Sequence, residues 1–144
     1  MNVSGILYTK LSADAGVSAI CSSRIYPLTI PQKASYPAAV ITVIANEPSD
    51  TKTGASTLDA WRVQIDSYAA TMLAAQHLDS AIRSAIDRFR GTVTVSGDTD
   101  YFVDGIRYEN TNDIMEGEKD IFRRSTDYQI RIHRRAGQNP NRSD

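Results

Sequence analysis

The hydrophobic pattern changes from a strand period over residues 56–68 to a helical period over residues 71–89, and this change restricts the fold more than any other feature of the sequence. In the first range apolar and polar residues alternate, which predicts a strand with one apolar and one polar face. The alternating residues are Trp61, Val63 and Ile65 against Arg62, Gln64 and Asp66. In the second range the period is helical. A strand that leads directly into an amphipathic helix predicts a helix packed on a sheet.

The predicted helix over residues 71–89 carries a narrow apolar stripe on one side. The stripe contains Ala74, Leu78, Ala81, Ile82, Ala85 and Phe89, and the polar side contains Gln76, Asp79, Ser80, Arg83, Asp87 and Arg90. Small alanines on the stripe would let the helix lie close to a sheet. Gly91 is the predicted stop, because glycine readily takes the conformation that ends a helix.

The other predicted elements complete an α+β domain. They are an opening helix from Val3 that stops near Gly16, a further turn at 17–20, a proline-rich connector or edge segment at 24–37, strands at 38–44, 92–95, 101–110 and 121–133, a hairpin loop at 49–55 and an acidic turn at 116–118. Runs of strands separated from helices favour a mostly antiparallel β-sheet with two helices packed on one face. Residues 1–134 are predicted to form a single domain, and residues 135–144 a disordered polar tail.

Composition excludes several classes of protein. The chain has 144 residues, 41% of them hydrophobic and 23% charged, which is typical of an ordinary soluble domain. A single cysteine cannot form an internal disulfide. No run approaches the ~20 apolar residues that a membrane helix needs. The net charge of −1 is unlike that of a dedicated DNA-binding protein.

Charge is balanced in total but not in position. Residues 98–120 contain eight acidic and two basic residues, whereas residues 121–144 contain six arginines and two acidic residues. This asymmetry is typical of surfaces that meet partners of opposite sign. A set of solvated strand faces and loops would show the same pattern.

The sequence offers little for catalysis or metal binding. Its two histidines, His77 and His133, have no metal-ligand spacing, and no motif surrounds Cys21, which is predicted to be a partly buried small side chain. The pair Asp98 and Asp100 is not followed by a calcium-loop pattern. We therefore expect no enzyme activity, no catalytic residues, no bound metal and no cofactor.

Two motifs together resemble a known protein family. The first is Arg24-Ile25-Tyr26-Pro27 followed by Pro31-Gln32 and Tyr36-Pro37, and the second is Trp61-Arg62-Val63-Gln64-Ile65-Asp66-Ser67-Tyr68-Ala69 leading into the long helix. With the closing strand 126–132, this order is similar to that of the tail completion, or tail terminator, proteins of long-tailed bacteriophages and prophages. The similarity covers about residues 3–133.

The resemblance implies a structural virion protein at the head-proximal end of the tail, assembled in the cytoplasm of the bacterial host. Such subunits form a ring, expected to be a homohexamer, that stops tail-tube polymerisation and offers a docking surface to the head–tail connector. Viral DNA passes through the ring without sequence-specific binding. The alternatives are a phage head–tail joining (neck) protein and a small nucleic-acid-binding module.

A ring requires contacts between different surfaces of identical subunits, and the two charged stretches are candidates for them. The residues expected at subunit–subunit contacts or in the lumen are Asp98, Asp100, Asp104, Glu116, Glu118, Arg123, Arg124 and Arg131. The acids either meet the arginines of the next subunit or line the lumen, where they would repel the DNA backbone. A contact with the tail tube is expected at the hairpin loop, at Asp50, Thr51, Lys52, Thr53 and Gly54.

Overall fold

The computed structural model describes residues 2–51, 54–116 and 121–133, and for residues 47–51, 54–57 and 115–116 it describes the backbone alone. The α+β class is confirmed, with about 28% helix and 49% strand. The helices are α1 (Val3–Ser12), α2 (Ala15–Cys21) and α3 (Met72–Ile86). The strands are β1 (Ile25–Pro27), β2 (Ala38–Thr51), β3 (Gly54–Ala69), β4 (Gly91–Thr94), β5 (Asp100–Glu116) and β6 (Ile121–His133).

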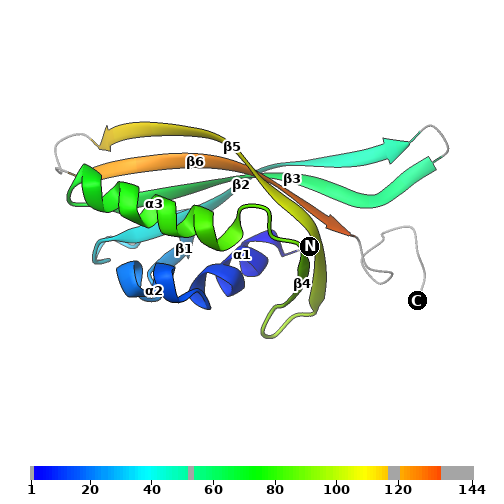
Figure 1. The fold of residues 1–144 in the computed structure, drawn as a ribbon, viewed down its shortest axis with the longest axis horizontal. Helices are drawn as coiled ribbons and strands as arrows, with labels where there is room; N and C mark the ends of the chain where they lie inside the picture. The colour runs from blue at the N-terminus through cyan, green and yellow to red at the C-terminus, as the bar shows by residue number, and fades with distance from the viewer. Residues whose placement is uncertain (1, 52–53, 117–120, 134–144) are drawn as a thin grey trace.

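The strands form one sheet in the order β1-β2-β3-β6-β5-β4 (Figure 1). All neighbouring strands are antiparallel except β1 and β2, which run parallel. The β2–β3 hairpin points away from the helices, and β5 and β6 meet at the opposite end of the sheet (Figure 1). The edge strands β1 and β4 are short, so each covers only part of its longer neighbour.

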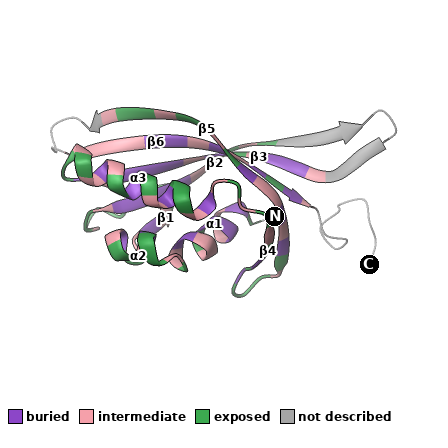
Figure 2. Cartoon of the chain, viewed as in Figure 1, coloured by how far each residue is buried: buried purple, intermediate pink, exposed green. Residues whose placement is uncertain are grey.

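Helices α1, α2 and α3 cover one face of the sheet, and the core lies between the two layers (Figure 2). The predicted alternation in β3 and β6 explains this, because every second side chain points to the helices. Val63 and Ile65 of β3 and Ile130 and Ile132 of β6 are buried in this core. In β2 the burial at Ala38–Ile41 extends to both faces, as its continuously apolar sequence predicts.

Helix α3 is shorter than predicted and is rotated about its axis. It begins after Thr71, whose hydroxyl accepts a hydrogen bond from the Ala74 backbone N–H at 3.1 Å. It ends at Ile86, and Arg88 then takes a positive φ of 66°, so Gly91 is not the stop but the first residue of β4. The buried side is Ala75, Leu78, Asp79, Ile82 and Ile86. Placing Asp79 on the polar side was therefore wrong.

The opening segment forms two short helices in place of one helix and a further turn. Asn2 caps α1 by accepting from the Gly5 N–H, and Asp14 caps α2 by accepting from the Val17 N–H. The second cap starts a new helix just before Gly16, so that glycine lies inside α2 and does not end α1. Side chains of both caps supply the acceptors that a helix start requires.

Two predictions about the strands needed correction, whereas the predicted connector or edge segment 24–37 does contain an edge strand, β1. Arg24 Nε donates to the Pro37 carbonyl at 2.8 Å, which ties the two ends of this segment together. The predicted loop 49–55 is mostly strand, because Asp50 pairs with Ala55 and Thr51 with Gly54. Strand β5 continues to Glu116, well past the predicted end at residue 110. Long polar stretches form strands here because each pairs with a neighbouring strand of the sheet.

The buried side of α3 predicts how much stability is lost when one of its side chains is truncated. Ile82→Ala should lower the free energy of unfolding by about 2–5 kcal/mol, because it removes a fully buried side chain and leaves a cavity. Leu73→Ala, on the same helix but 62% exposed, should change it by less than about 0.5 kcal/mol. Urea denaturation of both variants measures the difference. Equal losses would contradict the orientation of α3.

Candidate functional site

The acidic and arginine-rich stretches lie side by side in the same chain. Strand β5 carries most of the acidic stretch and pairs with β6, which begins the arginine-rich one. Asp113 and Arg124 are directly opposite each other in this pairing. The two stretches are therefore neighbours within one subunit, so part of the opposite charge is paired inside the subunit and not between subunits.

Arg124 lies between two carboxylates of its own chain. Its Nε is 3.5 Å from Asp79 Oδ2 on α3 and 3.4 Å from Asp113 Oδ1 on β5. The Thr126 hydroxyl donates to Asp79 Oδ1 at 2.6 Å, and Thr126 also contacts the Thr111 hydroxyl at 3.1 Å. This polar cluster fastens α3 to the sheet from inside. It also occupies Arg124, one of the residues expected at a subunit contact.

Asp79 is the most strongly buried carboxyl of this cluster, with 7% of the residue exposed. Burial raises the pKa of Asp79, because loss of hydration outweighs the hydrogen bond from Thr126 and the charge of Arg124. Sequence reasoning missed this residue. Its only signal was its position one residue after Leu78, at the edge of the apolar stripe.

The remaining acids of the predicted set have different surroundings. Asp98 accepts a hydrogen bond from the Tyr101 hydroxyl at 2.7 Å, next to the turn between β4 and β5. Asp104 Oδ1 lies 3.7 Å from Arg90 Nε and 3.4 Å from His133 Nε2. Asp100 is exposed at the start of β5. The structure thus distributes these acids over the turn before β5 and along β5 itself, and does not gather them at one site.

For several predicted contact residues the structure describes only the backbone, and others lie outside the described residues. Glu116 ends β5 and pairs through its backbone with Ile121, while Glu118 lies outside the described residues. In the hairpin, the backbones of Asp50, Thr51 and Gly54 belong to β2 and β3, and Lys52 and Thr53 lie outside the described residues. The predicted tail 135–144 also lies outside them.

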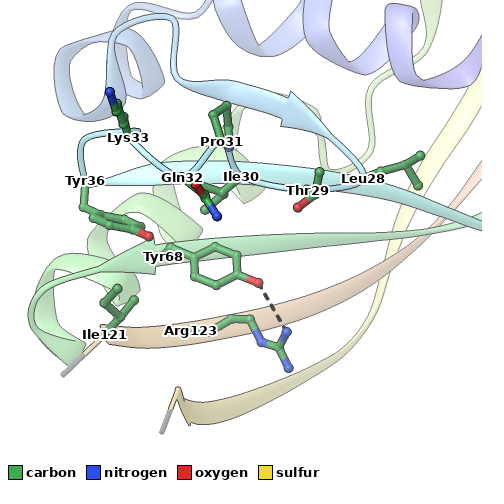
Figure 3. Close-up of a pocket in the computed structure, with 10 residues that line it drawn as sticks. All are labelled: Leu28, Thr29, Ile30, Pro31, Gln32, Lys33, Tyr36, Tyr68, Ile121 and Arg123. Carbon is green, nitrogen blue, oxygen red and sulfur yellow. Dashed lines mark hydrogen bonds between the residues drawn. The ribbon is translucent and has the colours of Figure 1, made fainter. Parts of the chain in front are cut away.

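A groove lies between the segment 28–36 and the ends of β3 and β6 (Figure 3). Its volume is about 740 Å³. Tyr68 and Arg123 form one wall, where Arg123 Nη1 donates to the Tyr68 hydroxyl at 3.3 Å, and Tyr36 points in from the segment (Figure 3). Lys33 is the other cation among the described residues that line the groove, and none of those described residues is acidic. Arg123 is one of the predicted contact residues, but the groove could not be predicted from the sequence, because its walls are more than thirty residues apart in the chain.

The face of the sheet opposite the helices carries exposed arginines. Arg131 is exposed on β6, and Arg107 of β5 and Arg62 of β3 both lie opposite Gln129 in the pairing. Arg62 Nη2 is 4.0 Å from Asp127 Oδ2, and Arg107 Nη2 is 3.5 Å from Glu109 Oε2. These pairs are solvent-exposed and therefore weak, so this face can exchange them for contacts with a partner.

The described residues show no arrangement suited to metal binding. Among them, no group of three or more His, Cys, Asp or Glu side chains could hold a metal ion. Cys21, predicted to be partly buried, is fully buried in the core. Burial raises the pKa of its thiol, which disfavours the reactive thiolate. Within the same part of the chain, no helix is long and apolar enough to cross a membrane.

Comparison with known proteins gives two findings. The family model described as "Tail completion protein gp17" matches residues 6–133. A solved structure described as "Virion of native gene transfer agent (GTA) particle" contains a chain with the same fold, with a TM-score of 0.67 and 17% sequence identity, over 91% of this chain and 94% of that one. A search of curated protein sequences gives no significant match.

The burial of Asp79 predicts a pH dependence. A carboxyl whose pKa is raised by folding stabilises most below its ordinary value of 3.8, and this contribution is lost as the pH rises through the raised folded pKa. Asp79→Asn keeps the acceptor for Thr126 and cannot ionise. Relative to this variant, the wild type should become less stable as the pH rises from about 3 to 7. Urea denaturation across that range measures it, and a difference that does not change with pH would contradict the prediction.

Two tyrosines in the same region provide a matched pair. The Tyr108 hydroxyl contacts the Thr111 hydroxyl at 2.8 Å, whereas the buried Tyr128 hydroxyl has no hydrogen-bond partner among the described residues. Tyr108→Phe should cost about 1 kcal/mol, and Tyr128→Phe should be neutral or stabilising, because it removes an unsatisfied buried group. Thermal denaturation compares them. A larger loss from Tyr128→Phe would show that its hydroxyl is satisfied.

Proposed function

Because this chain belongs to the tail completion protein gp17 family, it is a structural protein of phage-type tails, and we propose that it is the terminator that caps the tail tube. In this proposal six copies close into a ring at the head-proximal end of the tube. The ring ends tube polymerisation, presents a docking surface to the head–tail connector and lets viral DNA pass through its lumen. The family match over residues 6–133 is the observation that carries the proposal.

The geometry of the chain supports a ring through its asymmetry. A closed ring needs two different surfaces that fit each other on successive subunits. The groove beside Tyr68 and the β2–β3 hairpin lie at opposite ends of the sheet (Figures 1 and 3). We propose that the hairpin end contacts the tube, and that the acids of β5 either meet arginines of the next subunit or line the lumen.

The tube itself provides the direct test. Purified protein added to polymerising tail tubes should shorten them and narrow their length distribution, because capped ends no longer accept tube subunits. Electron microscopy measures the lengths. An unchanged distribution would contradict termination. Light scattering on the isolated protein tests the alternatives, since a twelve-membered ring indicates a neck protein and a monomer with salt-sensitive DNA affinity indicates a nucleic-acid-binding module.

The charge contact needs a substitution that leaves the fold intact. Reversing Arg124 would place a third carboxylate beside Asp79 and Asp113, so it tests the fold and not the ring. Arg131→Glu changes an exposed residue on β6 and should lower the ring yield roughly tenfold if this face meets acids of the next subunit. Arg88→Glu, an exposed arginine after α3, makes the same change in net charge as a control. Equal ring yields would place the interface elsewhere.

A further inference from the structure

Two strands of the sheet are longer than the neighbours that cover them. Strand β1 pairs with β2 only at residues 39–41, so the outer edge of β2 has no strand partner among the described residues from 42 to 51. Strand β4 pairs with β5 only at residues 100–103. Beyond it, the Arg88 N–H donates to the Ile106 carbonyl and the Asp87 carboxylate accepts from the Tyr108 N–H. From 109 to 116 the outer edge of β5 likewise has no strand partner in the described part of the chain. Open edges of this length pair readily with other strands.

The backbone groups that face these open edges follow from the alternation of the strands. In β2 the Ala39 N–H donates to Arg24 and the Ile41 carbonyl accepts from Leu28, so these residues face outward. The bulge between Val43 and Ala45 shifts the alternation, which turns Asn46 and Pro48 outward. Proline has no N–H, so Pro48 can offer only its carbonyl to a strand that pairs at this edge, whereas Asn46 can offer both its N–H and its carbonyl.

The same reasoning applies to β5. The Tyr108 N–H donates to Asp87 Oδ1 at 3.2 Å, so Tyr108 faces away from β6. The bulge between Tyr108 and Asn110 again shifts the alternation. Thr111 and Asp113 therefore direct their N–H and carbonyl groups to the open edge. Backbone N–H and carbonyl groups that are removed from water need hydrogen-bond partners, and a neighbouring strand supplies them.

We propose that the open edge of β2 in one copy pairs with the open edge of β5 in the next copy, so that one sheet continues from subunit to subunit. The proposal rests on the ring proposed above and names its main contact. The two edges lie on opposite sides of the sheet, as a head-to-tail contact requires. Successive antiparallel pairings through β3 and β6 make β2 and β5 run in opposite directions, so the new pairing is antiparallel.

The register of the sheet decides how the copies must be placed. Asp113 of β5 and Ala39 of β2 lie at the same height along the strand direction. The pairing connects them across the sheet through Arg124 of β6 and Ser67 of β3. The centre of the open β2 edge is about eight residues farther along, which is about 27 Å. A level arrangement is blocked, since β1 and β4 occupy the edges there. The next copy must therefore be displaced along the strands, and such a stagger is what closing a sheet of tilted strands requires.

Hydrogen exchange of the full wild-type chain tests the pairing without a substitution. Mass spectrometry would compare the ring with the monomer. Amides in peptides 42–51 and 109–116 should exchange at least roughly tenfold more slowly in the ring than in the monomer. The exchange rates of residues 91–94 in β4 should not change. A ring whose two edge peptides exchange at the monomer rate would overturn the edge pairing and leave the ring itself standing. A chain that forms no ring, alone or on tail tubes, would overturn both proposals.

A substitution at the β2 edge gives an independent readout. Asn46→Pro removes an outward N–H and should lower the ring yield roughly tenfold, whereas Asn46→Ala keeps that group and should form rings normally. Circular dichroism verifies that both variants fold. Equal ring yields from the two folded variants would overturn the proposal, and if the proline variant does not fold, the exchange experiment decides.

Discussion

Packing of α3 against β3 and β6 is the interaction on which the rest of the molecule depends. The apolar side of the helix covers the centre of the sheet, and the cluster of Asp79, Thr126 and Arg124 fixes the helix at one point of that surface. A polar cluster of this kind stabilises only while every member keeps its partner. It also sets the orientation of the helix, because a small rotation would leave the buried carboxyl unsatisfied.

The sheet has two different faces and, in the described part of the chain, edges without a strand partner on β2 and β5. The helices bury one side, whereas the other presents exposed arginines and the groove beside Tyr68. The strands are longer than the edge strands that flank them. For a protein that acts alone, such edges favour aggregation. In the proposed ring, the edges of β2 and β5 would pair with those of neighbouring copies.

The charged stretches illustrate how far sequence reasoning reaches. Their separation along the chain was clear, and it led to the prediction of contacts between subunits. Pairing of β5 with β6 instead brings Asp113 and Arg124 together in one subunit. Contacts between subunits stay a prediction for Arg131 and the acids of β5. The groove could not be predicted, since its walls come from a connector and two strand ends that only the fold brings together.

The sequence by itself determined the α+β class, the alternation in β3 and β6, the existence of α3 and the resemblance to tail completion proteins. These features follow from local periodicity and from motifs that are contiguous in the chain. Tertiary structure decided the rest: the burial of Asp79, the extension of β5 to Glu116 and the strand pairing within the hairpin. The burial of a polar residue and the pairing of a polar strand depend on a partner that is distant in the sequence, so local periodicity does not reveal them.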